Sequence, residues 1–392
     1  MATIVVSGAL ANKPFNGGEA WVRLSWLLGL RRLGHRVCFL EEIDADTCRD
    51  AVGEPSPFAC SANLHYFQDV IGQFGLAGRS ALVCATGGQT WGLSMSDLTA
   101  LAAEADLLVN ISGHLSLPEL FDRFRRKVYI DIDPGFTQFW HAAGNPGARL
   151  AGHDDFFTIG ENIGAADCPI PTGGLPWRRT RQPVVLDHWP VSPDPGGGRF
   201  TTVASWRGPF GPVEFGGKTY RLKVHEFRKF LDLPRRVPAP FEVALHIHPA
   251  DGKDLAALRE SGWRVVDPRA VASDPLAFRR YVETSAAEFS VAQGVYVETN
   301  SGWFSDRSVR YLAAGKPVLL QDTGFSRSLP VGEGLLAFRT PDEAAAGAEK
   351  IVQHYDHHCR AARAIAEEHF DSDRILGRLL EEVGIRPRGD HD

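Results

Sequence analysis

The 392-residue sequence contains no Cys-x-x-Cys pair. Its six cysteines are scattered, at Cys38, Cys48, Cys60, Cys84, Cys168 and Cys359. This spacing argues against a zinc ribbon and against a disulfide scaffold, and it favours a reducing cytoplasm. No segment is long and uncharged enough to span a membrane. The first residues lack a basic leader region, so residues 4–7 are interpreted as a buried strand rather than as a signal peptide. We therefore expect a cytoplasmic protein without stable membrane insertion.

The sequence also lacks a strong excess of either charge. The formal net charge is −6, 44% of the residues are hydrophobic and 23% are charged. These values describe a globular protein with no bulk attraction for nucleic acid, and no nucleic-acid partner is expected. The length exceeds what one ordinary core requires and predicts two domains.

The first half alternates short β-branched runs with amphipathic helices. The strand-like runs lie at residues 4–8, 36–42, 81–87, 106–112, 127–133 and 156–162. This alternation predicts a doubly wound parallel sheet. The Gly-x-Gly-x-x-Gly fingerprint is absent after the first run, which counts against an NAD-type oxidoreductase or sugar-nucleotide epimerase.

A stretch dense in proline and glycine then interrupts the pattern and is interpreted as a linker. A second series of strand-like runs follows at residues 200–206, 241–247, 263–267, 294–298 and 317–322, and the chain is helical from Pro341 onward. The predicted organisation is therefore a Rossmann-like domain over 1–180, a linker over 181–199, a second Rossmann-like domain over 200–370, and a helix with a frayed tail over 371–392.

The segment TNSGWFSDRSVRYLAAGKPVLLQD, residues 299–322, is the most informative of the chain. Its pattern indicates a strand end, a polar loop, a helix, a Gly-Lys-Pro break and a second strand. A loop of this kind presents backbone N–H groups at a helix N-terminus, where a phosphate binds. An ordinary turn capped by Asp306 is the alternative. The donor-binding residues predicted here are Ser301, Gly302, Trp303, Ser305, Asp306, Arg307, Ser308, Asp322 and Thr323.

Polar residues also follow the strand-like runs of the first half. Because ligands collect at the carboxyl ends of parallel strands, these residues are candidates for contacts with an acceptor molecule. Turn chemistry alone is the alternative for each of them. The predicted acceptor or loop residues are Gly17, Gly18, Glu19, Trp91 and Glu161.

His114 and Asp133 are the candidate acid/base groups, since a hydroxyl acceptor must lose a proton to a group within hydrogen-bond reach. Asp131 lies two positions before Asp133 and shares its face of the strand. The two carboxylates could act together or bind a metal, but separate hydrogen-bond partners are the favoured interpretation. A turn at Asp133-Pro134-Gly135 and a backbone-bonded His114 remain the alternatives.

In the second half, Arg207 and Lys223 follow strand and loop segments and are predicted to neutralise a diphosphate leaving group. A solvated basic face is the alternative. Asp267 is placed by position alone where a nucleobase or ribose would be read. His246 and His248 have a spacing that two metal ligands can use, but only Asp251 lies near as a third, so no metal site is predicted.

Four segments together resemble GT-B glycosyltransferases. The stretch NGGEAWVRLSWLLGLRRLGHRV resembles the opening of that fold, and VASWRG followed by Lys223 resembles its pair of donor-phosphate ligands. The stretch SGWFSDRSVRYLAAGKPVLLQD resembles its loop-helix-Ala-Gly-x-Pro-Val signature. KVYIDIDPG matches in position the acceptor-side strand of the retaining branch.

The resemblance implies two Rossmann-like domains of α/β class that face a cleft, with C-terminal helices packing back. It implies that the N-terminal domain binds the acceptor and the C-terminal domain the nucleotide-sugar donor. It implies transfer of a sugar from a nucleoside diphosphate donor to a hydroxyl or amine of a small molecule, such as a natural product. It implies no cofactor beyond the nucleotide sugar, which is a co-substrate. A homodimer is left open.

One residue departs from the pattern of the family. Many members place an acidic residue five positions before the glycine that ends the helix, where it holds the donor ribose, and this sequence has Arg310 there. Asp306 or Asp322 could take over the ribose contact. A different donor, or a non-catalytic subunit that binds nucleotide sugars, is the alternative.

Overall fold

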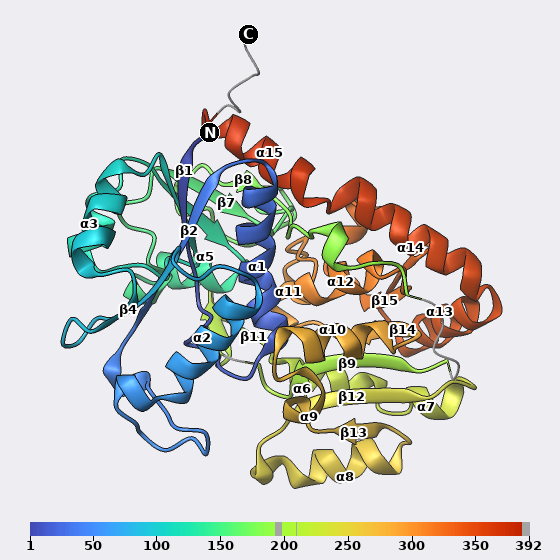
Figure 1. Cartoon of the computed structure of the whole chain (residues 1–392). Coiled ribbons are helices and arrows are strands. Elements are labelled where there is room, and N and C mark those ends of the chain that lie inside the picture. Colours follow the sequence, from blue (N-terminus) through green and yellow to red (C-terminus); the bar gives the residue numbers. More distant parts are fainter. Residues whose placement is uncertain (193–197, 209, 386–392) are drawn as a thin grey trace.

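The computed structural model describes residues 1–192, 198–208 and 210–385. Its strands form an eight-stranded sheet, a six-stranded sheet and a two-stranded hairpin. Figure 1 shows the two large sheets in separate halves of the molecule, with α13, α14 and α15 running from the second half back to the first. The predicted α/β class with C-terminal helices that pack back is confirmed.

The first sheet has the order β4-β3-β2-β1-β5-β6-β7-β8 and is parallel except for the antiparallel pair β3–β4. Its strands are β1 (Thr3–Ser7), β2 (Arg36–Ile43), β3 (Ser80–Cys84), β4 (Thr90–Gly92), β5 (Leu107–Ile111), β6 (Lys127–Asp131), β7 (Asp155–Thr158) and β8 (Arg178–Arg179). Its helices are α1 (Gly17–Arg32), α2 (Ala62–Gln73), α3 (Met95–Glu104), α4 (Pro118–Phe121) and α5 (Phe136–Ala142). The central strands β1 and β5 are mostly apolar and, apart from Thr3, buried, as expected of a parallel sheet covered on both faces.

The second sheet has the order β13-β12-β9-β14-β15-β16 and is wholly parallel. Its strands are β9 (Phe200–Ser205), β12 (Phe241–His246), β13 (Arg264–Val266), β14 (Ala287–Ser290), β15 (Val318–Gln321) and β16 (Leu335–Phe338). The helices that accompany it are α6 (Lys223–Phe227), α7 (Leu233–Arg236), α8 (Gly252–Glu260), α9 (Pro268–Ala272), α10 (Pro275–Glu283), α11 (Gly294–Glu298) and α12 (Asp306–Ala313), followed by α13 (Pro341–Gln353), α14 (Tyr355–His369) and α15 (Ser372–Glu382).

The sequence pattern was wrong about one strand of the second sheet. Residues 294–298 read as a strand because they alternate valine with other residues, but they form the short helix α11. The strand at this place is β14, whose sequence AEFS is too polar to signal a buried strand. Glu288 is nevertheless fully buried there, because an arginine pairs with it. The strand therefore depends on the ion pair between Glu288 and Arg307, which the local sequence does not show.

The region predicted as linker contains no strand among its described residues. Leu186–His188 forms a single turn, after a lone bridge from Val184 to Asp371. Residues 193–197 of that linker and 386–392 of the predicted frayed tail lie outside the described residues. The domain boundaries therefore stay a prediction.

The two halves are packed tightly where the first helix begins. A Cβ on Gly17, the first residue of α1, would lie 2.0 Å from the carbonyl oxygen of Asp274, just before α10. The indole N–H of Trp21 donates a hydrogen bond of 2.8 Å to the carbonyl of Pro275. A glycine is required at position 17 for this close approach, and the contact fixes how the two sheets face each other.

The hairpin formed by β10 (Val213–Phe215) and β11 (Lys218–Tyr220) belongs by sequence to the second half but packs on α5 of the first. The ring of Phe139 lies 4.8 Å from that of Phe215 and is stacked 5.0 Å from that of Tyr220. The hairpin therefore adds a second aromatic bridge between the halves.

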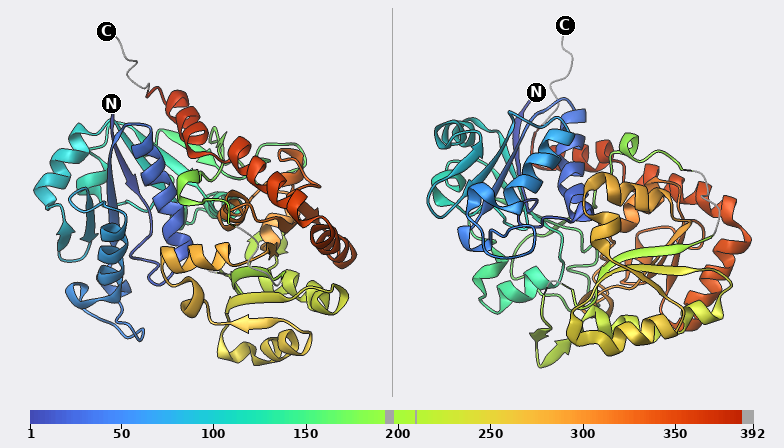
Figure 2. Two further views of the ribbon diagram at one scale, coloured as in Figure 1. Left: turned by 45° about the vertical axis from the view of Figure 1, so that its right-hand side comes forward. Right: turned by 60° about the horizontal axis from the view of Figure 1, so that its bottom comes forward.

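The last helix returns to the first domain. Helix α15 lies along α1, and Figure 2 shows this from two further directions. A Cβ on Gly29 of α1 would lie 2.5 Å from Leu376 and 2.9 Å from Ser372, so this glycine admits α15 rather than the sheet. Within the described residues, no helix combines the length and the apolar character needed to cross a membrane.

We expect Gly29→Ala to lower the free energy of unfolding by about 1–3 kcal/mol, because its methyl group overpacks the α1–α15 contact. Gly72→Ala is the matched control: Gly72 lies in helix α2, and a Cβ there would meet no heavy atom within 4 Å. That change should raise stability by about 0.5–1 kcal/mol through helix propensity. Urea unfolding of both variants measures this, and equal effects would show that α15 does not press on α1.

Candidate active site

A cleft of about 620 Å³ lies between the two domains. Its walls come from the loop and first turn after β1 on one side, and from the carboxyl ends of β9 and β12 with their following segments on the other. The lining includes Lys13, Phe15, Asn16, Gly18, Glu19, Ser205, Lys223, His246, Arg269, Gln293, Asp306 and Arg307. The cleft thus lies at the carboxyl edge of the second sheet, where parallel sheets bind ligands.

The first wall is held in shape by a buried carboxylate. Glu41, at the end of β2, is fully buried and accepts hydrogen bonds of 2.7–2.9 Å from the backbone N–H groups of Leu10, Ala11 and Asn12. Burial raises the pKa of Glu41 to about 7 although these bonds act in the opposite direction. The loop that Glu41 fixes carries Lys13 into the cleft.

Helix α1 begins on this wall with an acidic residue. The side chain of Asn16 caps the helix by accepting the backbone N–H of Glu19 at 3.2 Å. Glu19 pairs with Arg23 one turn later. Burial alone would raise the pKa of Glu19, but the charges of Arg23 and Lys13 outweigh it and lower the pKa to about 2. Glu19 is therefore ionised at every pH at which the protein would work.

The two predicted aspartates of β6 and its following turn have different surroundings. Asp131 is fully buried and accepts side-chain hydrogen bonds of 2.7–2.8 Å from Thr137, Gln138 and Thr158. Asp133 accepts only the hydroxyl of Tyr296 from the other domain, at 3.1 Å, among the bonds that the structure gives its side chain. Burial, Glu19 and Asp131 raise the pKa of Asp133 to about 6. Asp131 is a structural anchor, and Asp133 is the carboxyl group suited to accept a proton near neutral pH.

His114 is less suited to that role. Burial and the cations Arg23, Arg149 and Lys13 lower the pKa of this imidazole to about 3. It is therefore neutral at physiological pH, but it is too weak a base to accept a proton readily there. Of the two candidate groups, the electrostatics favour Asp133.

The second wall carries two cations. Arg307 donates to Glu288 at 2.5 Å, to Ser290 at 2.5 Å and to the carbonyl of Val203 at 2.8 Å, which fixes its guanidinium across the ends of β9 and β14. Burial and the charge of Arg307 lower the pKa of Lys223 to about 7. The second wall therefore presents one permanent cation and one amine that ionises near neutral pH.

The loop before α12 is built largely on its own hydrogen bonds. Gly302 has φ +78°, and its N–H donates to the carbonyl of Thr323 at 2.8 Å. Ser301 is buried and receives the N–H of Trp303. A Cβ on Gly302 would lie 2.8 Å from the backbone nitrogen of Asn162 in the other domain. This glycine is required both for the positive φ and for the contact between domains.

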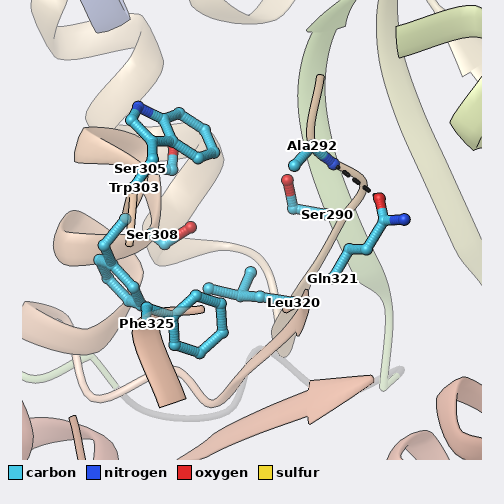
Figure 3. A pocket seen from close by; sticks show the side chains of 9 residues that line it. Ser290, Ala292, Trp303, Ser305, Ser308, Leu320, Gln321 and Phe325 are labelled. Atoms are coloured by element: carbon cyan, nitrogen blue, oxygen red, sulfur yellow. Dashed lines mark hydrogen bonds between the residues drawn. The ribbon is translucent and has the colours of Figure 1, made fainter. Parts of the chain in front are cut away.

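Behind this loop lies a cavity of about 10 Å³, which has room for a single water molecule. Figure 3 shows that Ser305 and Ser308 face Ser290 across it, while Gln321 accepts the N–H of Ala292 at 3.1 Å. The serine hydroxyls predicted as phosphate ligands at 305 and 308 therefore turn into the domain, and neither lines the cleft.

Arg310 lies between the domains, behind the cleft. It is fully buried, donates to Asp306 of its own helix, and reaches Ser25 of α1 at 3.3 Å. In the family that the sequence resembles, the residue at this position holds the donor ribose. Here Arg310 makes an interdomain contact instead. Of the two suggested substitutes for the acidic residue, Asp306 lines the cleft and Asp322 does not.

Several predicted residues are used elsewhere in the structure. Arg207 pairs with Asp251, Asp267 caps α9 by accepting the N–H of Arg269, and Glu161 pairs with Arg181. Asp322 binds Gly324, Ser326 and Arg339, and Trp91 packs on Phe67. None of these five predicted residues lines the cleft. The partners of Arg207, Glu161 and Trp91 are distant in the sequence and therefore not visible in its local pattern, whereas Asp267 is taken up by a local helix cap.

Other residues in or directly behind the cleft went unpredicted. Arg23 follows Glu19 by four positions, a spacing that could have signalled the pair. Lys13, Glu288 and Tyr296 had no such signal, and Tyr296 fell in the segment misread as a strand. Among residues 1–192, 198–208 and 210–385, no group of three or more His, Cys, Asp or Glu residues is placed to hold a metal ion.

No protein-family model matches the sequence, and no curated protein matches it either. Solved structures do match over nearly the whole chain. HepE from Anabaena in complex with UDP-glucose is 12% identical, with a TM-score of 0.62 over 98% of this chain and 99% of HepE. Sucrose-phosphate synthase from Thermosynechococcus elongatus is 11% identical, with a TM-score of 0.53 over 98% and 99%.

A putative UDP-N-acetylglucosamine 2-epimerase from Listeria monocytogenes is also similar, at 11% identity and a TM-score of 0.50 over 97% of this chain and 96% of that one. Identities this low establish the fold alone. This chain has the GT-B fold, as the sequence resemblance predicted.

The raised pKa of Asp133 makes a prediction about stability. Its folded-state pKa of about 6 exceeds the ordinary 3.8, so the folded protein binds more protons between these values, and stability is lost as the pH rises from about 4 to 6. Asp133→Asn should remove this loss, which amounts to at most about 3 kcal/mol. Urea unfolding at pH 4 and pH 8 measures the difference between variant and parent.

Asp69→Asn, on the exposed face of α2, is the control and should leave the pH dependence unchanged. Parallel pH profiles for Asp133→Asn and the parent would contradict the assignment of a raised pKa to Asp133.

Proposed function

We propose that this chain is a glycosyltransferase that moves a sugar from a nucleoside diphosphate donor to a hydroxyl or amine of a small molecule in the cytoplasm. The observation that carries the proposal is the pairing of opposite charges across one cleft, with Lys223 and Arg307 on the second domain and Glu19 on the first. Asp133 of the first domain does not line this cleft but lies close enough to Glu19 and Lys13 to be affected by their charges. One wall suits an anionic leaving group, and the other suits the loss of a proton.

The second wall would hold the donor diphosphate. Negative charge builds on the bridging oxygen as the bond from the sugar carbon to the diphosphate breaks. Lys223, Arg307 and the N-terminus of α12 lie on the wall where that charge would develop. Because Glu288 and the strand ends already fix the guanidinium of Arg307, little reorganisation is needed as the charge appears.

The first wall would activate the acceptor. The acceptor oxygen forms a bond to the anomeric carbon of the sugar, its proton passes to the carboxylate of Asp133, and the electron pair of the broken bond remains on the diphosphate. A pKa of about 6 leaves Asp133 ionised at neutral pH and still basic enough for the transfer. Packing of the two domains around the cleft would exclude water, which would otherwise compete as acceptor.

The structural comparisons support a nucleotide-sugar ligand. HepE is similar in fold over the whole chain and was crystallised with UDP and with UDP-glucose. Uridine nucleotides are therefore the first donors to test.

Binding of UDP should depend on Lys223. We expect Lys223→Ala to weaken UDP binding about 10- to 100-fold, the effect of losing one hydrogen bond to a charged group. Lys253→Ala, an exposed lysine of α8 in the same domain, is the matched control and should bind as the parent does. Isothermal titration calorimetry measures both. Unchanged affinity in Lys223→Ala would remove Lys223 from the donor site.

Binding should also take up a proton. The pKa of Lys223 is lowered to about 7 in the free protein, so most of this amine is neutral at pH 8. A diphosphate beside it favours the ammonium form and raises the pKa again. Calorimetry at pH 8 in buffers of different ionisation enthalpy should show uptake of a large part of one proton, and Lys223→Arg should show none. Equal binding enthalpies in all buffers would contradict this.

Transfer itself is tested by incubating the protein with UDP-sugars and a panel of small-molecule alcohols and amines, and detecting glycosylated product by mass spectrometry. Asp133→Asn should lower kcat about 10²- to 10⁴-fold, as expected for loss of a general base. Isomerised nucleotide sugar without any acceptor would instead indicate an epimerase. Nucleotide-sugar binding without either product would indicate the non-catalytic subunit.

A further inference from the structure

Tyr296 links the two domains through a hydrogen bond. It lies on the short helix α11, and its side chain is almost entirely buried. Its hydroxyl donates to the Oδ1 atom of Asp133 at 3.1 Å. Its ring is stacked on that of Trp303 with 4.4 Å between centroids. Its carbonyl accepts the backbone N–H of Ser301 at 3.2 Å. One residue therefore touches both the loop before α12 and the candidate base of the other domain.

We propose that Tyr296 is a positioning residue that couples the loop of residues 301–303 to the Asp133 carboxylate. The inference rests on the proposed function, in which that loop lies on the donor side and Asp133 accepts the proton of the acceptor. When the loop is seated, the tyrosine hydroxyl holds Asp133 in place and favours its ionised form.

The charges around Asp133 explain why one hydroxyl matters. Glu19 from α1 and Asp131 from β6 both disfavour a second negative charge, while Lys13 from the loop after β1 favours it. The hydroxyl of Tyr296 is the remaining group that favours the carboxylate. Burial and these same negative charges hold the pKa of the phenol well above 10, so the hydroxyl stays protonated and stays a donor.

The packing around the Tyr296 ring explains how the loop of residues 301–303 would affect Asp133. The ring of Phe136 contacts that of Tyr296 edge-on at 5.9 Å, and Trp303 covers one of its faces. A Cβ on Gly135 would lie 3.1 Å from the side chain of Val295. Helix α11 is thus pressed against the turn that follows Asp133. Loss of the stack on Trp303 would free the ring and weaken the hydrogen bond from the tyrosine hydroxyl to the carboxylate.

The consequence is an ordered activation. Without the hydrogen bond the pKa of Asp133 rises further, so a larger fraction of the group is protonated at neutral pH. The base would therefore be more effective when the donor-side loop and both domains are in place, which reduces hydrolysis of the nucleotide sugar.

Tyr296→Phe tests the coupling because it keeps the ring and its stack but removes the hydroxyl. A base works when deprotonated, so the rate rises with pH through its pKa, and a higher pKa moves that limb to higher pH. We expect the midpoint of the acid limb of kcat to rise by about one pH unit, with kcat on the high-pH plateau close to that of the parent. Tyr220→Phe is the matched control: Tyr220 stacks on Phe139 in the same aromatic cluster, and its loss of a hydroxyl should shift nothing.

Trp303→Leu tests the path through the stack. It leaves the hydroxyl and the carboxylate unchanged but removes the surface that orients the ring, and it should move the acid limb in the same direction by a smaller amount. An unmoved midpoint in both Tyr296→Phe and Trp303→Leu, or an equal shift in Tyr220→Phe, overturns the proposal.

A second readout does not need activity. The pH dependence of urea unfolding reports the pKa of Asp133 in the full chain. Tyr296→Phe should move the upper end of the pH range of stability loss upward by about one unit relative to the parent, while the lower end, set by the unfolded chain, stays where it is. In an Asp133→Asn background the same change should move nothing. The shift with no detectable transfer would support the coupling and refute the proposed activity. Transfer with identical pH profiles in parent and variant would refute the coupling and leave the activity standing.

Discussion

A fully buried guanidinium fixes how the two domains of this protein meet. Arg310 has no exposed surface, and a cation without water must find its hydrogen bonds within the protein. It finds them on two helices: Asp306 at the start of its own helix α12, and Ser25 on α1 of the other domain. The bonds hold α1 and α12 with their first turns toward one cleft. The close packing of Gly17 on Asp274 then leaves little freedom for another arrangement.

The chemistry of the cleft follows from that arrangement. Glu19 and Asp306 each stand in the first turn of a helix, with an arginine four residues later on the same side. Because the two helices lie together, these charges lie close to one another. Burial then shifts the pKa values of the neighbouring groups in opposite directions. The pKa of Lys223 falls to about 7 and that of Asp133 rises to about 6. An acid and a base with pKa values near neutrality are the combination that proton transfer and leaving-group stabilisation require.

Much of the fold could be predicted from sequence. The β-branched runs marked all the long strands of the first sheet, and the segment of residues 299–322 identified the loop, the helix α12 and the strand β15 in order. The failures had a common cause. Strand β14 is polar and was missed because an arginine elsewhere in the chain pairs with Glu288, while the apolar segment of residues 294–298 folded into a helix against the other domain. Local patterns do not contain these partners.

For the site, the sequence by itself determined which edge of each sheet would carry the polar residues, because parallel strands place all their carboxyl ends together. It thereby pointed to Glu19, Asp133, Lys223, Asp306 and Arg307 as neighbours of a cleft. Only the tertiary structure decided which polar groups remain available there. Arg207, Glu161 and Asp322 lie at the right ends of strands but are bound by Asp251, Arg181 and Arg339. The order of the strands determines where the polar side chains lie. Ion pairs and hydrogen bonds with residues distant in the chain determine which of these side chains remain available to bind a ligand.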